Sequence, residues 1–175
     1  MKIIKTLFIL GILGLIAGSA VIYSGIYPIG ADVPHNKLTY WIFEQAREHS
    51  IERASAQIKV PDLSSADMLL SGGADYNDMC ASCHLKPGQK DSDMSLGLYP
   101  KPPNLSLTHH GEAHEDDDKI TEKKMFWTIK HGIKASGMPA WGITHDDDRI
   151  WAMVAFIKKM PDLTPNQYQV LTARE

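Results

Sequence analysis

The chain has 175 residues, and 43% of them are hydrophobic, which suits one folded domain with short attachments. It carries 18 lysines and arginines against 21 aspartates and glutamates; setting aside Lys2 and Lys5, near the N-terminus, leaves 16 basic against 21 acidic residues, a net charge of −5. A surface of this sign is steered toward basic patches on partner proteins, so the charge excludes nucleic acid as a partner.

Residues 1–27 are predicted to be a transmembrane anchor. After the two lysines, residues 6–23 carry no charge, and eighteen uncharged residues are long enough to span a bilayer. The lysines place the N-terminal end in the cytoplasm and the remainder outside. Small residues at 18–20 also fit the cleavage site of a signal peptide, although the apolar run continues to Ile26 and favours a retained anchor.

Residues 28–61 are predicted to form a linker and an amphipathic helix. Asn36 is the expected N-cap of a helix over residues 37–58. Its apolar side is expected to consist of Leu38, Trp41, Ile42, Gln45 and Ala46, and its solvated side of Glu44, Arg47, Glu48, Glu52 and Arg53. The helix is either a stalk that packs against the following domain or a docking helix for a membrane partner, with Trp41 as its anchor.

The next helix begins near Ser65 or Asp67, either of which can cap it, and leads into Cys80-Ala81-Ser82-Cys83-His84. Two cysteines separated by two residues and followed by histidine are the attachment signature of a c-type haem. One helical turn brings both thiols to one edge of the ring, where each adds to a vinyl group. His84 then offers its imidazole to the iron as the proximal ligand.

Two other interpretations of the cysteines are weaker. A thioredoxin-like pair needs a βαβ setting, and no buried strand run surrounds Cys80. A zinc site would need a fourth ligand, which His109, His110 or His114 could supply. Neither interpretation accounts for the second iron ligand that the downstream chain offers.

That second ligand is predicted to be Met138, a soft thioether donor that raises the haem potential. Gly137 permits a tight turn before it and Pro139 stiffens the loop after it. The alternatives are that Met138 fills a gap in the core, or that Met94, the other methionine in a loop, is the ligand instead.

The structure of the remaining segments is predicted from their local sequence patterns. Residues 86–98 are predicted to be a polar loop, and three prolines at 100, 102 and 103 enforce extended backbone. Residues 109–118 hold three histidines and five acids, which form either a second metal site or a solvated loop that caps the next helix. Helices are expected over residues 121–131, where Trp127 is placed at the haem edge, and over 150–160; residues 167–175 are expected to be a loosely held tail.

Over residues 62–168 the sequence resembles the class I (His/Met) cytochrome c family, and within it the membrane-anchored bacterial monohaem proteins. The resemblance rests on Gly72 and Tyr76 before the CxxCH motif, on Pro102-Pro103-Asn104-Leu105, on Gly137-Met138-Pro139 and on the closing helix. It implies an all-α class I cytochrome c fold, a small helical domain around one covalent haem. Residues 169–175, beyond this domain, are expected to be a tail.

The resemblance also implies specific contacts. The C-terminal helix should cross the N-terminal one at Gly72, with Tyr76 and Phe156 covering the haem edge. A proline carbonyl should accept a hydrogen bond from Nδ1 of His84, and Pro100, Pro102 and Pro103 are equally good candidates.

The expected site is therefore one haem c, held covalently by Cys80 and Cys83, with His84 and Met138 as axial iron ligands. Both iron positions are then filled, so we expect outer-sphere electron transfer and no enzymatic activity. The protein should lie in the bacterial inner membrane with one span and its haem domain in the periplasm. The expected partners are a quinol-oxidising complex or dehydrogenase on one side and a terminal oxidase or reductase on the other. The alternatives are a fixed subunit of such a complex, or a haem sensor with a labile Met138.

Overall fold

The structure is a computed structural model that describes residues 1–107 and 121–173. Within these ranges the regular elements are helices and no β-strand occurs, which confirms the predicted all-α class. The chain divides into two units, Met1–Val33 and Pro34–Glu175, and each is described by itself.

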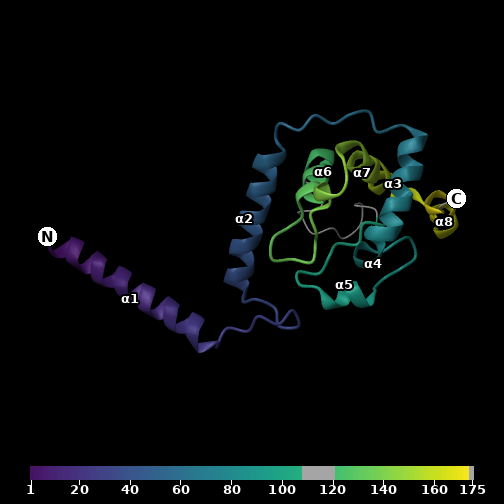
Figure 1. Cartoon of the computed structure of the whole chain (residues 1–175). Helices are drawn as coiled ribbons and strands as arrows, with labels where there is room; N and C mark the ends of the chain where they lie inside the picture. Colours follow the sequence, from purple (N-terminus) through teal and green to yellow (C-terminus); the bar gives the residue numbers. More distant parts are fainter. Residues whose placement is uncertain (108–120, 174–175) are drawn as a thin grey trace. The chain divides into compact units, whose positions relative to one another are not determined.

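The first unit consists of helix α1 (Lys2–Ser24) and the segment after it (Figure 1). None of the side chains of α1 is buried, and the mean hydropathy of its most apolar stretch is 2.2, high enough for a membrane span. Gly25 ends the helix in the left-handed conformation (φ 65°), where a residue without Cβ is not strained. The predicted apolar helix is confirmed, and its length and composition fit a membrane anchor or a signal sequence.

The core of the second unit is the crossing of α3 (Ala66–Met79) and α7 (Asp147–Lys159). A Cβ at Gly72 would lie 2.0 Å from the carbonyl oxygen of Ala152, so only glycine allows the two backbones to approach this closely. The expected crossing at Gly72 is confirmed. The side chains that are almost fully buried around it are Tyr76, Ile150, Met153, Val154, Phe156 and Met160.

An ion pair and an aromatic cluster fix the same crossing. Arg149 on α7 donates to both carboxylate oxygens of Asp75 on α3, with 2.7 Å between Nη2 and Oδ1, and Asp75 is only 5% exposed. The rings of Tyr76 and Phe156 lie 5.6 Å apart, and the ring of Tyr168 contacts both. The crossing is therefore held by packing and by a charge-assisted contact.

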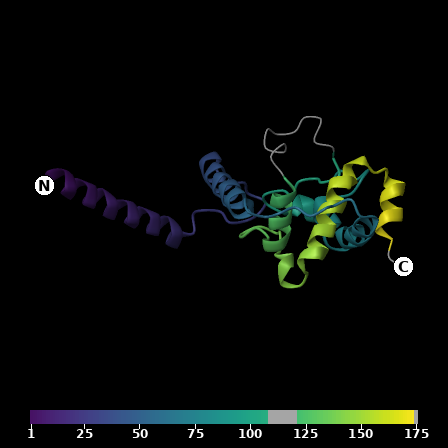
Figure 2. The same cartoon turned by 90° about the horizontal axis from the view of Figure 1, so that it is seen from above.

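Residues 165–172 correct a prediction, because part of the expected loose tail is the helix α8 (Pro165–Thr172). Thr164 and Gln167 form a capping box at its start, with Pro165 in the first turn. Tyr168 is 2% exposed, and a Cβ at Gly73 would lie 2.8 Å from the carbonyl oxygen of Leu171, so α8 lies directly against α3. In Figure 2 this helix is the yellow ribbon next to the C-terminus.

Helix α2 (Lys37–Ser55) begins as predicted, since the side chain of Asn36 accepts a hydrogen bond from the backbone N–H of Thr39 at 3.0 Å. It belongs to the second unit and packs against α6 (Glu122–His131), and its buried residues are Ile51 and Ser55. The packing favours the prediction of a stalk.

The prediction of which side of α2 is packed and which is in solvent is wrong for the first half of the helix. Leu38, Trp41 and Ile42, expected on the packed side, are exposed. Glu44 and Glu48, expected in solvent, are half-buried instead. Contact with α6 is made by the face that carries Ile51 and Ser55, and that face, rather than the larger apolar stripe, sets the rotation of the helix.

Short elements complete the second unit. Helix α5 (Asp93–Gly97) lies inside the segment predicted to be a polar loop, with Ser92 and Ser95 forming a capping box. The other three are α4 (Ala81–His84), η2 (Trp141–Ile143) and η3 (Met160–Asp162).

Candidate haem site

The CxxCH motif directly follows α3, with Cys80 between the two helices and the other four residues forming α4. The backbone N–H of His84 donates to the carbonyl oxygen of Cys80 at 2.8 Å, so Cys80, Cys83 and His84 lie within one helical turn. Neither cysteine is in a disulfide, so both sulfurs are available for thioether bonds. Burial raises the pKa of the Cys80 thiol to about 12.

The imidazole of His84 is oriented by the proline-rich segment. Its Nδ1 lies 3.0 Å from the carbonyl oxygen of Pro103, so Nδ1–H donates and Nε2 is left to bind a metal. Of the three candidate prolines, the structure therefore selects Pro103. Burial lowers the pKa of His84, although the hydrogen bond to Pro103 acts in the opposite direction. A neutral imidazole is the form that coordinates iron.

The turn after His84 is stabilised by hydrogen bonds from Tyr76. Its hydroxyl donates to the carbonyl oxygens of Leu85, at 2.7 Å, and of His84, at 3.2 Å. Burial raises the pKa of Tyr76 far above its ordinary value, so the hydroxyl remains a donor. Leu85 has φ 66°, which is rare for a leucine, and its side chain is 1% exposed. Sequence reasoning gave Tyr76 only a covering role and missed this hydrogen bond.

Met138 lies in a loop whose backbone is fixed by its neighbours. Its N–H donates to the hydroxyl of Ser136 at 3.1 Å, and its carbonyl accepts the N–H of Ile133 at 3.2 Å. A Cβ at Gly132, which has φ 63°, would lie 2.7 Å from the same carbonyl oxygen. Met138 is half-buried and packs against the core cluster that contains Cys80, whereas Met94 is 53% exposed.

The loop that carries Met138 lies against the proline-rich segment whose Pro103 contacts His84. A Cβ at Gly137 would lie 2.5 Å from Cδ2 of Leu98, and Leu98 begins the segment that continues to Pro103. The donor set comprises two free thiols, an imidazole with one nitrogen already engaged, and a thioether. These residues fit a covalently attached haem with nitrogen and sulfur axial ligands.

A comparison with protein families decides the class. The family model for "Cytochrome C oxidase, cbb3-type, subunit III" matches residues 67–157, more than half of the chain, and this range contains all four candidate residues. The chain belongs to this family of c-type cytochromes. Membership implies a covalently bound haem c, haem-based electron transfer and redox proteins as partners. No curated protein and no solved structure gave a significant match.

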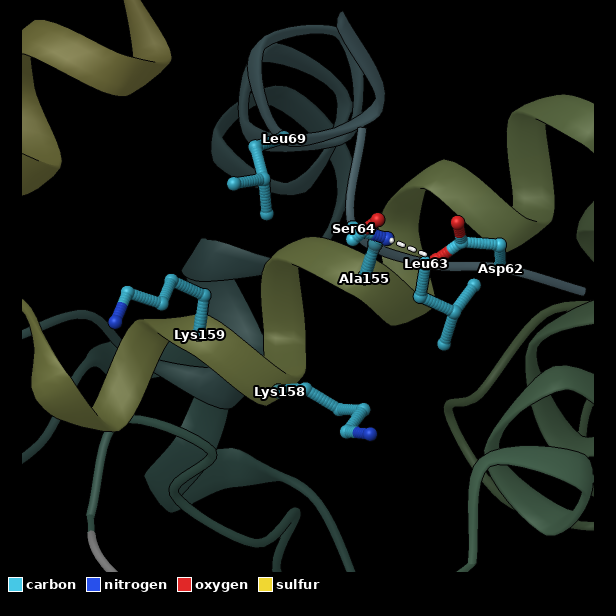
Figure 3. A pocket seen from close by; sticks show the side chains of 7 residues that line it. All are labelled: Asp62, Leu63, Ser64, Leu69, Ala155, Lys158 and Lys159. Carbon is cyan, nitrogen blue, oxygen red and sulfur yellow. Dashed lines mark hydrogen bonds between the residues drawn. The ribbon is translucent and has the colours of Figure 1, made fainter. Parts of the chain in front are cut away.

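A surface hollow of about 490 Å³ lies between α3 and α7 (Figure 3) and contains none of the four candidate residues. Its two lysines are already paired, Lys158 with Glu122 and Lys159 with Asp162, so no free positive charge converges there.

The histidine-rich segment at residues 109–118 lies outside the described residues. Within residues 1–107 and 121–173, no group of three His, Cys, Asp or Glu side chains is arranged to hold a metal ion. Trp127, expected at the haem edge, lies half-buried on α6 with its ring 4.9 Å from that of His131.

Proposed function

We propose that this cytochrome is a membrane-tethered carrier of single electrons with one haem c. Cys80 and Cys83 would form the two thioether bonds, and His84 and Met138 would bind the iron from opposite sides. The observation that carries this proposal is the contact between Nδ1 of His84 and the carbonyl oxygen of Pro103, since it leaves Nε2 available to bind a metal.

The haem supplies a one-electron Fe(II)/Fe(III) couple, and the chain supplies a fixed setting for it. Pro103 and Tyr76 hold the His84 turn, while Ser136 and Ile133 hold the Met138 loop. Rigidly held ligands of this kind would favour fast outer-sphere transfer. If His84 and Met138 both bind the iron, it would offer no position to a substrate, and the protein would not be an enzyme.

Helix α1 would anchor the protein in the bacterial inner membrane, with Lys2 and Lys5 in the cytoplasm and the haem domain in the periplasm. The export of the domain agrees with c-type attachment, which takes place outside the cytoplasm. Electrons would come from a quinol-oxidising complex or a dehydrogenase and would pass to a terminal oxidase or reductase.

A second candidate is a fixed subunit of a respiratory oxidase. The description of the matched family, subunit III of a cbb3-type oxidase, favours it. Mild-detergent purification separates the two candidates: a carrier purifies alone, whereas a fixed subunit retains its oxidase in constant stoichiometry through size-exclusion chromatography.

The ligand assignment is tested by optical spectroscopy of the purified, oxidised protein. Sulfur ligation gives ferric haem a weak far-red charge-transfer band, which we expect in the wild type and in Met94→Ala but not in Met138→Ala. Reduced wild type should not bind carbon monoxide, whereas reduced Met138→Ala should. A wild type that lacks the band and binds carbon monoxide would contradict the carrier and favour a haem sensor.

A further inference from the structure

The first half of α2 presents a large apolar surface to solvent. Five of its side chains are exposed although they are aliphatic or aromatic, and residues 38–43 contain no charge. The exposed fractions are 66% for Leu38, 39% for Tyr40, 58% for Trp41, 49% for Ile42 and 61% for Phe43. Such a concentration of exposed apolar area marks an interaction site.

Along the chain, exposed apolar residues also precede α2, and they are absent from its second half. Ile26, Tyr27, Ile29 and Val33, in the connecting segment, are all exposed. Beyond Phe43 the next exposed large hydrophobic residue is Val60, and the second half of α2 carries charged side chains on its solvent side. The exposed apolar residues therefore gather on the part of the domain that is nearest to α1 along the chain.

The exposed apolar side chains are not confined to the stripe of Leu38, Trp41 and Ile42. Successive residues of an α-helix are rotated by about 100°, so Leu38 and Ile42 point to one side while Tyr40 and Phe43 point to others. A helix that is apolar on several sides is typical of a membrane-embedded segment or of the core of a large protein. Because α1 is itself a candidate membrane span, the arrangement fits lipid better than a single protein surface.

We propose that the first two turns of α2 insert into the interfacial region of the bilayer that α1 spans, with the charged second half of the helix in water. This inference rests on the proposed anchoring by α1. Only twelve residues, 25–36, connect the two helices, so the start of α2 lies within about 40 Å of the end of α1 even when they are fully extended. Tryptophan and tyrosine, here Trp41 and Tyr40, are the residues enriched at this depth of a membrane.

The test is the environment of single spin labels on the full-length, haem-loaded protein in phosphatidylcholine vesicles. Cys80 and Cys83 are consumed by the haem and do not react, so each introduced cysteine labels alone. The test positions are Trp41→Cys and Leu38→Cys. The controls are Leu13→Cys in α1, Ser50→Cys in the second half of α2, and Val170→Cys, an apolar residue of α8 that is 75% exposed.

The label's collision rates with oxygen, which partitions into lipid, and with a water-soluble nickel chelate report its surroundings. We expect the labels at positions 38 and 41 to collide more often with oxygen than with the nickel chelate, like the label at 13. The labels at 50 and 170 should collide more often with the nickel chelate. An unaltered haem absorption spectrum verifies that each variant is folded.

Three results overturn the proposal. Labels at 38 and 41 that favour nickel while the label at 13 favours oxygen refute the inserted helix and leave the anchor intact. A label at 13 that favours nickel refutes the anchor itself. Labels at 38 and 41 that are shielded from both reagents place this surface against protein, either a second copy or a partner subunit.

Discussion

The carbonyl oxygen of Ala152 occupies the space in which a side chain at Gly72 would begin, 2.0 Å from the position of its Cβ. This contact belongs to two helix backbones, and neither can move without displacing the buried residues around it. Both Tyr76, under the His84 turn, and the core face of α7 depend on the spacing it sets.

Replacing Gly72 by alanine should therefore destabilise the haem domain by about 1–3 kcal/mol or more, because overpacking forces the helices apart. Urea unfolding followed by far-ultraviolet circular dichroism measures this loss. Gly97→Ala is the matched control, since nothing lies within 4 Å of its Cβ position. Equal stability of the two variants would show that the helices do not pack this closely.

Tyr76→Phe should cost roughly 1–3 kcal/mol, because it leaves the buried carbonyl of Leu85 without its hydrogen bond. The loosened His84 turn should also shift the haem reduction potential, which protein-film voltammetry can measure. Tyr168→Phe is the control: its hydroxyl donates to Asn77 at 3.2 Å, away from the motif, and its loss should leave the potential unchanged. A Tyr76→Phe protein with wild-type stability and potential would contradict the role of this hydroxyl.

Removal of the guanidinium in Arg149→Gln should destabilise the domain by about 1.5–3 kcal/mol, because Asp75 is almost fully buried and loses a charge-assisted contact. A double-mutant cycle with Asp75→Asn, measured by urea unfolding, isolates the pair. Lys101→Gln breaks the pair with Asp91, in which both side chains are half-exposed, and should cost less than about 1 kcal/mol. A coupling energy between Arg149 and Asp75 that is no larger than the loss of stability in Lys101→Gln would contradict a stabilising role for the buried contact.

The pair of Glu122 and Lys158 links α6 to α7 and should make stability depend on pH. The hydrogen bond from Lys158 lowers the pKa of Glu122 below its ordinary value of 4.5. The folded state thus binds this proton less readily than the unfolded state, so the stabilisation is present above pH 4.5 and is lost as the pH falls through the folded pKa. The pair is partly exposed, so its contribution should stay below about 1 kcal/mol.

Thermal unfolding of wild type and Glu122→Gln between pH 3 and pH 7 measures this contribution. The wild type should be more stable at pH 7, and the difference should shrink toward pH 3. A stability difference between wild type and Glu122→Gln that grows as the pH falls would contradict a lowered pKa of Glu122 in the folded state.

Features encoded locally could be predicted from the sequence. The CxxCH motif and the Asn36 cap each depend on a few neighbouring residues with a fixed chemical requirement, whereas the crossing at Gly72 was expected from the family resemblance. The start of α8 is also encoded locally, because Thr164, Pro165 and Gln167 form a capping pattern that predicts a helix. The prediction of a loose tail over residues 167–175 did not take this pattern into account.

Features that depend on tertiary packing could not be predicted. Arg149 and Asp75 are 74 residues apart, and nothing in either local pattern joins them. The choice of Pro103 among three similar prolines is made by the position of the His84 ring. The rotation of α2 follows from its contact with α6, which outweighs the larger apolar stripe that the sequence displays.

The short connection between α1 and α2 has a kinetic consequence for an anchored cytochrome. If α1 anchors the protein as proposed, a haem domain held by a twelve-residue connection searches for its partners by lateral diffusion in the same membrane. Recognition can then be weak, so that each complex dissociates soon after the electron has moved. Turnover would be set by how many copies share a patch of membrane rather than by how tightly any two proteins bind.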